Sequence, residues 1–359
     1  MKKNSNILKQ YLTKLLIFTK ILSFAMQKLI YILIGICIVV ACTKLEKAEE
    51  WQLRTPDGTP AQTVSVDAMN IRNPFIYLDK KTLTYYMTGD GGYLWISKDM
   101  HKWDGPYEIL QLDSTMWMGG NPIIESPEIH LYKRKFYYVA TFVRPDVIIE
   151  NVNGQDIKRS SCQLFVADSI QGPYKPIQAE KPLLRADHAT RNATFTTDEY
   201  GAGYIIYNHA WEQNNNETVQ IIRLDDNFGQ QIGEPYIMFK SSNIPLEKEE
   251  RKPIAEGPFI FTTEEGMLGI LFTTIINGEP CISVAYSQTG GLNGPWVIEP
   301  EPLLTGKYGQ PVLFRDFDGS MVMLMHKDTV ANGKKQSIPY FIEADMQFDK
   351  LKINNTYNF

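Results

Sequence analysis

A short motif recurs five times along the sequence and limits the folds that the chain can adopt. Each copy is a polar or glycine residue followed by proline or alanine, and it runs directly into apolar residues that favour β-strands. From Pro74, the steps to Pro127, Ala193, Pro258 and Pro311 are 53, 66, 65 and 53 residues. A repeat of this length predicts an architecture in which one supersecondary unit is copied along the chain.

Each motif is followed by a turn and a second β-rich run, as expected for a hairpin. These second runs span residues 83–88, 136–142, 203–209, 267–274 and 320–326. Gly-Pro followed by an aromatic residue recurs from Gly105, Gly172 and Gly294, and suits a tight turn that re-enters a strand.

Repeated antiparallel strands are compatible with a sandwich, a barrel or a propeller, but only a propeller restarts one unit around an axis. The sequence therefore predicts an all-β, five-bladed β-propeller of four-stranded antiparallel blades. The five motifs would open the first strand of each blade and converge at one mouth of the central channel. Trp95, Trp103 and Trp296 are expected to pack within and between blades, and His326 is expected to belong to the core.

Composition and charge restrict the partners of the protein. The chain has 359 residues, 43% of them hydrophobic and 21% charged, which is ordinary for a globular protein with a large core. Its formal net charge of -5 provides no excess of positive charge to attract a polyanion, so no nucleic-acid partner is expected. A neutral sugar is compatible with this charge. The 12% aromatic content suits both sugar stacking and an all-β core.

The N-terminal segment has the pattern of an export signal. An apolar run over residues 29–41 follows Lys28 and ends at Cys42, and it is shorter than the roughly 20 residues that a bilayer span requires. This pattern resembles a bacterial lipobox. We expect an exported protein that is lipidated at Cys42 and anchored in the bacterial cell envelope, at the outer membrane.

The resulting division of the chain has three parts. Residues 1–42 form the signal region, in which translation is expected to start at Met26 unless the leader has two parts. Residues 43–50 form a polar tether, and residues 51–359 form the propeller domain. Within that domain, Cys162 and Cys281 are expected to be buried, unpaired thiols, although the sequence alone leaves a disulfide between them open.

The residues at the five openings carry a family resemblance. The sequence reads Asn-Ile-Arg-Asn-Pro-Phe-Ile at 70–76, Ser-Pro-Glu-Ile-His at 126–130, Asn-Ala-Thr-Phe at 192–195, Ala-Glu-Gly-Pro at 255–258 and Phe-Arg-Asp-Phe-Asp-Gly at 314–319. This series resembles the blade motifs of glycoside hydrolase family 43 from about residue 70 to residue 346. The resemblance implies a five-bladed propeller with a sugar-binding pocket at its axis.

The resemblance also implies roles for individual residues. In that family an aspartate of the first blade is the general base, an aspartate of the third tunes the acid, and a carboxylate of the fourth is the general acid. Glu256 stands at the position of the acid, whereas Asn73 and Asn192 stand at the positions of the two aspartates. A neutral amide hydrogen-bonds water but cannot take its proton. Gln310 replaces a histidine that lies near a bound cation in many members, so no cofactor is expected, and a structural cation near the axis stays open.

Further residues near the openings are candidates for the site. Glu125 and Asp187 are possible substitute bases, although an acid at such a position is more often a solvated loop residue. The residues expected to bind substrate are Arg72, Glu128, Arg191, His209, Trp211 and Gln310. The two arginines are expected to bind either sugar hydroxyls or neighbouring acids. Glu128 is expected either to reach the axis or to form a buried hydrogen bond. Trp211 could provide an aromatic face on which a sugar ring stacks.

Two functions from different classes follow from these residues. The first is a glycosidase that acts on arabinofuranosyl, xylosyl or related galactosyl units of plant polysaccharides. Its inverting mechanism would need an acid and a base about 6.5–9.5 Å apart. The second is a catalytically silent surface lipoprotein that binds an oligo- or polysaccharide in the same pocket. The retained Glu256 favours the first function, and the two asparagines favour the second.

Overall fold

A computed structural model gives the structure of the chain. It describes residues 51–214, 216–245, 254–331 and 333–357, together with residues 14, 20, 22–24 and 26–31 of the N-terminal segment. The chain divides into two compact units, Met1–Gln52 and Leu53–Phe359. Cys42, the apolar run from residue 32 and the predicted tether 43–50 lie outside the described residues. Among the residues that are described, no helix is long and apolar enough to cross a membrane.

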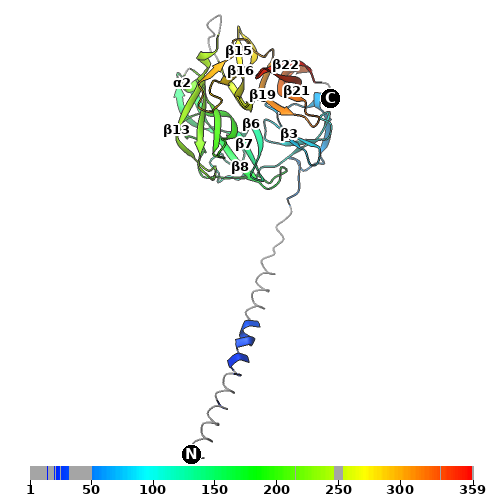
Figure 1. Ribbon diagram of the computed structural model, residues 1–359, viewed down its shortest axis with the longest axis vertical. Coiled ribbons are helices and arrows are strands. Elements are labelled where there is room, and N and C mark those ends of the chain that lie inside the picture. Colours follow the sequence, from blue (N-terminus) through cyan, green and yellow to red (C-terminus); the bar gives the residue numbers. More distant parts are fainter. Residues whose placement is uncertain are drawn as a thin grey trace, which may run out of the picture. The chain divides into compact units, whose positions relative to one another are not determined.

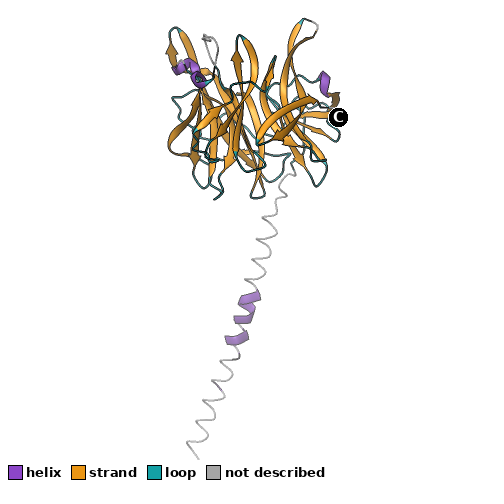
Figure 2. Cartoon of the chain, turned by 45° about the horizontal axis from the view of Figure 1, so that its top comes forward, coloured by secondary structure: helices purple, strands orange, loops and turns teal. Residues whose placement is uncertain are grey.

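The second unit consists of five antiparallel sheets that follow one another along the chain, and nearly all of its regular structure is strand (Figure 2). The first sheet contains β2 (Phe75–Asp79), β3 (Thr84–Thr88), β4 (Leu94–Ser97) and β5 (Lys102–Tyr107), with β1 (Gln62–Ser65) added beside β5. The second contains β6 (Ile123–Tyr132), β7 (Lys135–Val152), β8 (Gln155–Ala167) and β9 (Lys175–Pro176). The third contains β10 (Thr190–Thr197), β11 (Gly203–His209), β12 (Thr218–Leu224) and β13 (Gln231–Lys240).

The last two sheets repeat the same order. The fourth contains β14 (Glu256–Thr262), β15 (Leu268–Ile276), β16 (Glu279–Ser287) and β17 (Trp296–Ile298), and β18 (Leu304–Thr305) also pairs with β16. The fifth contains β19 (Tyr308–Arg315), β20 (Met321–Ala331), β21 (Lys334–Gln347) and β22 (Lys350–Thr356). The short helical elements are η1 (Val66–Ala68), α2 (Trp211–Asn214) and η2 (Ser241–Asn243).

The five sheets are the blades of a closed propeller. In Figure 1 they follow the colour order of the chain around the domain, and the first and last blades are neighbours. The innermost strands β2, β6, β10, β14 and β19 contact one another in turn, and β19 contacts β2. Ile71 and Asn70 fasten this junction, because the Ile71 N–H donates to the Ser337 carbonyl at 2.8 Å and the Asn70 side chain accepts the Ser337 N–H at 3.0 Å. The predicted five-bladed, all-β fold is confirmed.

The tryptophans and the recurring Gly-Pro pairs noted in the sequence lie within the blades. Trp103 is fully buried, Trp296 is buried and Trp95 packs against the core, so these three predictions are confirmed. The recurring Gly-Pro bonds are all cis, and the one at Gly105 lies within β5 rather than before a strand.

The two cysteines of the propeller domain are free and buried, as predicted. Cys162 lies in β8 and Cys281 lies in β16, in different blades. Burial raises the pKa of the Cys162 thiol to about 12, which makes it a poor nucleophile.

Every blade opens with a residue in the left-handed region of backbone conformation. These residues are Asn73, Ser126, Asn192, Gly257 and Gln310, with φ of 52°, 50°, 53°, 63° and 52°. In blades two to five the pairing register also shifts at this point. The shift is that of a β-bulge, which re-aims neighbouring side chains. At Gly257 a side chain would overlap the amide of Gln310, so a larger residue there would require that amide to move.

The backbone N–H of each left-handed residue donates to a side chain from the second strand, or the turn after it, of the preceding blade. We call these five contacts the interblade latches. They join Asn73 to His326 Nδ1 (3.3 Å), Ser126 to Asp90 Oδ1 (2.9 Å), Asn192 to Thr141 Oγ1 (2.9 Å), Gly257 to Asn208 Oδ1 (3.1 Å) and Gln310 to Thr273 Oγ1 (2.9 Å). In blades two to five, a latch satisfies a backbone donor that the bulge removes from the strand ladder.

Candidate active site

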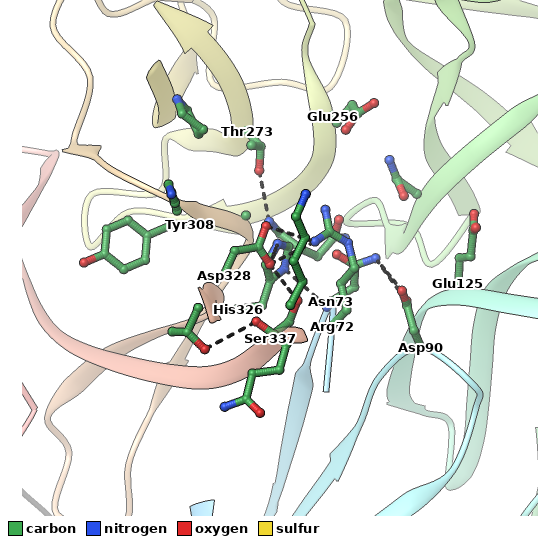
Figure 3. A pocket seen from close by; sticks show the side chains of 18 of the residues that line it. Arg72, Asn73, Asp90, Glu125, Glu256, Thr273, Tyr308, His326, Asp328 and Ser337 are labelled. Carbon is green, nitrogen blue, oxygen red and sulfur yellow. Dashed lines mark hydrogen bonds and ion pairs between the residues drawn. The ribbon is translucent and has the colours of Figure 1, made fainter. Parts of the chain in front are cut away.

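A cavity of about 980 Å³ lies where the blade openings meet. This volume is at the upper end of the range of about 300–1,000 Å³ that is usual for ligand pockets. The residue just before each left-handed residue lines it in all five blades: Arg72, Glu125, Arg191, Glu256 and Gly309. We call the first four the charged ring, because their charges alternate in sign around the cavity. Figure 3 shows Arg72, Glu125 and Glu256 around this opening.

Glu256 begins β14, and both of its neighbours in the chain are held by hydrogen bonds. The Ala255 carbonyl accepts from Asn208 Nδ2 at 2.5 Å, and the Gly257 N–H donates to Asn208 Oδ1 at 3.1 Å. The Ala255 N–H donates to Glu217 Oε2 at 2.9 Å. The backbone on both sides of the carboxyl is therefore fixed, and the side chain faces the cavity.

The electrostatic surroundings of Glu256 favour its protonated form. Burial raises the pKa of this carboxyl, and the neighbouring Glu212 and Glu125 carboxylates raise it further. Arg191 and Arg72 act in the opposite direction without reversing the rise. A raised pKa is what a general acid requires at neutral pH.

Glu217 is a second buried carboxyl beside Glu256, and no motif in the sequence marks it. It lies just before β12 and is only 1% exposed. Burial raises its pKa, and the charge of Glu256 raises it further. Two carboxyls in such proximity oppose the ionisation of each other, so the pair keeps a proton to higher pH than either group alone.

Asn73 lines the cavity, and its side chain is bonded to a carboxylate that the sequence analysis also missed. The Asn73 amide donates to Asp90 Oδ1 at 3.0 Å and to Asp90 Oδ2 at 3.2 Å. Figure 3 shows this contact at one side of the cavity, and Asp90 itself is part of the lining. Burial raises the pKa of Asp90 to about 6, against the opposing effect of the Ser126 N–H and the Asn73 amide.

Asn192 also lines the cavity and is held by the second blade and by its own blade. Its Oδ1 accepts the Ser126 hydroxyl at 2.8 Å, and its Nδ2 donates to Asn208 Oδ1 at 3.5 Å. Its backbone N–H forms the latch to Thr141. This residue therefore links the second and third blades at the cavity.

Both arginines of the charged ring are paired with acids. Arg72 Nη1 donates to Asp328 Oδ1 at 3.1 Å and to Oδ2 at 3.3 Å, and the Ser337 hydroxyl donates to Asp328 Oδ1 at 2.6 Å. Arg191 lies 3.2 Å from the Glu212 carboxylate. The pairs hold the guanidinium groups at the cavity, where further N–H groups suit sugar hydroxyls.

His326 and Gln310 lie on the fifth-blade side of the cavity, and both are buried. Burial lowers the pKa of His326, and Arg72 lowers it further, so the ring is neutral and its Nδ1 accepts the latch bond from Asn73. Gln310 takes the place of the histidine associated with a cation in the resembling family. Across the described part of the chain no group of three or more His, Cys, Asp or Glu side chains is arranged to hold a metal ion.

The structure places two predicted binding residues away from the cavity lining. Glu128 is buried, and its Oε2 is 2.7 Å from His130 Nε2, which corresponds to the buried hydrogen bond considered as its alternative. The His209 ring stacks on His188 at 4.3 Å and is hydrogen-bonded to Gln213.

The two remaining candidates are Trp211 and Asp187. Trp211 begins α2, and its side chain lies outside what the structure describes. Asp187 is exposed and bonded to Arg185 at 2.8 Å and 3.1 Å. The hydrogen bond from Arg185 lowers the pKa of Asp187 to about 2, which makes it a weak base, and it does not line the cavity.

Comparisons with known proteins agree with this geometry. A family model described as glycosyl hydrolases family 43 matches residues 65–336. Among solved structures, an endo-arabinase from Bacteroides thetaiotaomicron is 24% identical with a TM-score of 0.68, and the match covers 80% of this chain and 98% of that one. An endo-1,4-beta-xylanase from the same organism is 17% identical with a TM-score of 0.62, covering 82% and 97%. No curated protein matches the sequence significantly.

A third solved structure contains a bound sugar. It is an alpha-L-arabinanase of Cellvibrio cellulosa complexed with arabinohexaose, and it is 12% identical with a TM-score of 0.56. The match covers 80% of this chain and 96% of that one. At these identities the solved structures establish the fold of the propeller domain alone.

Proposed function

Since the chain belongs to glycoside hydrolase family 43, we propose that it hydrolyses plant polysaccharides at arabinofuranosyl or xylosyl units by an inverting mechanism. The observation that carries the proposal is Glu256, a carboxyl with a raised pKa that lines the cavity between fixed backbone neighbours. The names of the similar structures, arabinanases and a xylanase, support this choice of sugars.

In this proposal Glu256 donates its proton to the oxygen of the departing sugar. Burial raises the pKa of Glu256 and so favours its protonated form, and departure of the sugar as a neutral alcohol lowers the barrier. Arg72 and Arg191 are held at the cavity by their acid partners and offer N–H donors to the hydroxyls of the bound sugar. Asn73 and Asn192 offer amide groups for the same purpose.

The alternative is a silent protein that binds an oligosaccharide in the same cavity. Asn73 and Asn192 favour it, because neither amide accepts a proton from water. The two functions differ only in whether a bound glycosidic bond is cleaved, so one set of measurements separates them.

The test uses the domain from Trp51 onward with arabinan, xylan and galactan oligosaccharides. We expect slow release of shorter sugars, detected by chromatography, together with binding detected by calorimetry. Binding without release would contradict hydrolysis and support the silent alternative. Absence of both binding and release would contradict both functions.

We also propose that the protein is exported and lipid-anchored through Cys42 in the bacterial cell envelope. The apolar run that ends at this cysteine supports the proposal. Mass spectrometry of the protein from membranes is expected to find an N-terminal peptide that begins with diacylated Cys42. An unmodified Cys42 within a longer peptide would contradict the proposal.

A further inference from the structure

We propose that Asp90 is the general base of this site, in place of the aspartate that the family has at the position of Asn73. The proposal rests on the hydrolytic function above. Asp90 lines the same cavity as Glu256 and is joined to Asn73 by two contacts, at 3.0 Å and 3.2 Å. The Asp90 carboxylate is therefore hydrogen-bonded to the residue at the position where the family has its general base.

The interblade latches show that a carboxylate is not needed at position 90 for the fold. Asp90 occupies the latch position of the first blade, and the other four latches use His326, Thr141, Asn208 and Thr273. Each of these accepts one backbone N–H with a neutral atom. A largely buried carboxylate is costly to ionise, so a neutral residue would serve the latch alone better.

The hydrogen bonds of Asp90 leave capacity for a water molecule. Oδ1 accepts both the Ser126 N–H at 2.9 Å and the Asn73 amide at 3.0 Å, whereas Oδ2 has only the longer contact of 3.2 Å. An ionised carboxylate has about four acceptor sites, so this oxygen can accept a proton from water in the cavity. The Asn73 amide fixes the orientation of the carboxylate, and its own oxygen is available to position that water.

The reaction balances with these two carboxyls. A water oxygen bonds to the anomeric carbon, and the bond from that carbon to the departing oxygen breaks. The water proton goes to Asp90, and the proton of Glu256 goes to the departing oxygen. Exchange with solvent then restores both groups.

The charged surroundings of Asp90 set the expected pH dependence. Burial raises the pKa of Asp90 to about 6, and the charge of Glu125 also raises it, whereas Arg72 lowers it. The charge of Asp90 in turn raises the pKa of the buried Tyr138 hydroxyl. A base works only when ionised, so kcat/KM is expected to fall as the pH drops below about 6.

The decisive variant is Asp90→Asn, because it removes the charge and keeps the latch. Asn208 performs that latch in the third blade with an amide, so the fold is expected to survive. Loss of a general base predicts a fall in kcat/KM of about 10²- to 10⁴-fold. The double variant Asn73→Asp/Asp90→Asn returns the carboxylate to the family position and is expected to recover activity.

Three further measurements complete the experiment. Thermal unfolding of each variant reports the fold, and Asp187→Asn is the matched control, since Asp187 is exposed and off the cavity. Glu125→Gln tests the other carboxylate of the lining. Wild-type turnover that Asp90→Asn leaves unchanged, or that only Glu125→Gln abolishes, overturns the assignment of Asp90 and leaves the hydrolytic function intact. Absence of wild-type turnover overturns both.

Discussion

Replacement of Glu256 with glutamine is expected to lower kcat/KM for unactivated oligosaccharides by about 10²- to 10⁴-fold. The amide keeps the size of the side chain and its place at the cavity but has no acidic proton for the departing oxygen. Steady-state kinetics on arabinan and xylan oligosaccharides measure this loss. Sugar affinity is expected to change little, because the arginines and amides of the lining remain.

The nature of the departing group provides the control for this variant. An aryl group that leaves readily as an anion needs little protonation, so its hydrolysis by Glu256→Gln is expected to be far less impaired. Equal losses on both kinds of substrate would contradict the role of Glu256 as an acid and would indicate a role in binding or folding.

Replacement of Asn208 with leucine is expected to destabilise the domain and to disorder the Glu256 side chain. The variant leaves the Ala255 carbonyl and the Gly257 N–H without their buried partner. Each orphaned group costs about 1–3 kcal/mol, so the free energy of unfolding is expected to fall by about 2–6 kcal/mol. Because these two groups flank Glu256, the remaining folded protein is also expected to lose activity.

Denaturant unfolding measures the first effect, and kinetics well below the unfolding midpoint measure the second. Asn227→Leu is the matched control, because Asn227 is exposed in the turn after β12. If Asn208→Leu were as stable and active as the control, the proposed bracing of Glu256 by the third blade would be wrong.

The fold was predictable because its signal repeats. The spacing from Pro74 to Pro311 reflects five copies of one hairpin-based unit, and each copy restates the same strand and turn preferences. The extra strands β1 and β18 carry no such repetition and were not predicted. The interblade latches were also missed, although Asp90, Thr141, Asn208, Thr273 and His326 each lie 14–16 residues after the Pro or Ala of their motif.

The candidate site was only partly predictable, for a physical reason. Residues beside the motifs, such as Glu256 and Arg191, reach the cavity because the bulge at their openings aims them there. Glu217 and Asp90 lie in the loops that follow or precede strands, and burial rather than a motif raises their pKa. Burial depends on the packing of neighbouring blades, which local sequence does not encode.

The most direct test of the proposed mechanism is the configuration of the sugar that the wild-type domain releases first. Proton NMR during the first minutes of hydrolysis distinguishes the two anomers before they interconvert. An acid at Glu256 with a base at Asp90 that activates water predicts release of the inverted anomer. Release of the retained anomer, or no release at all, would contradict this mechanism.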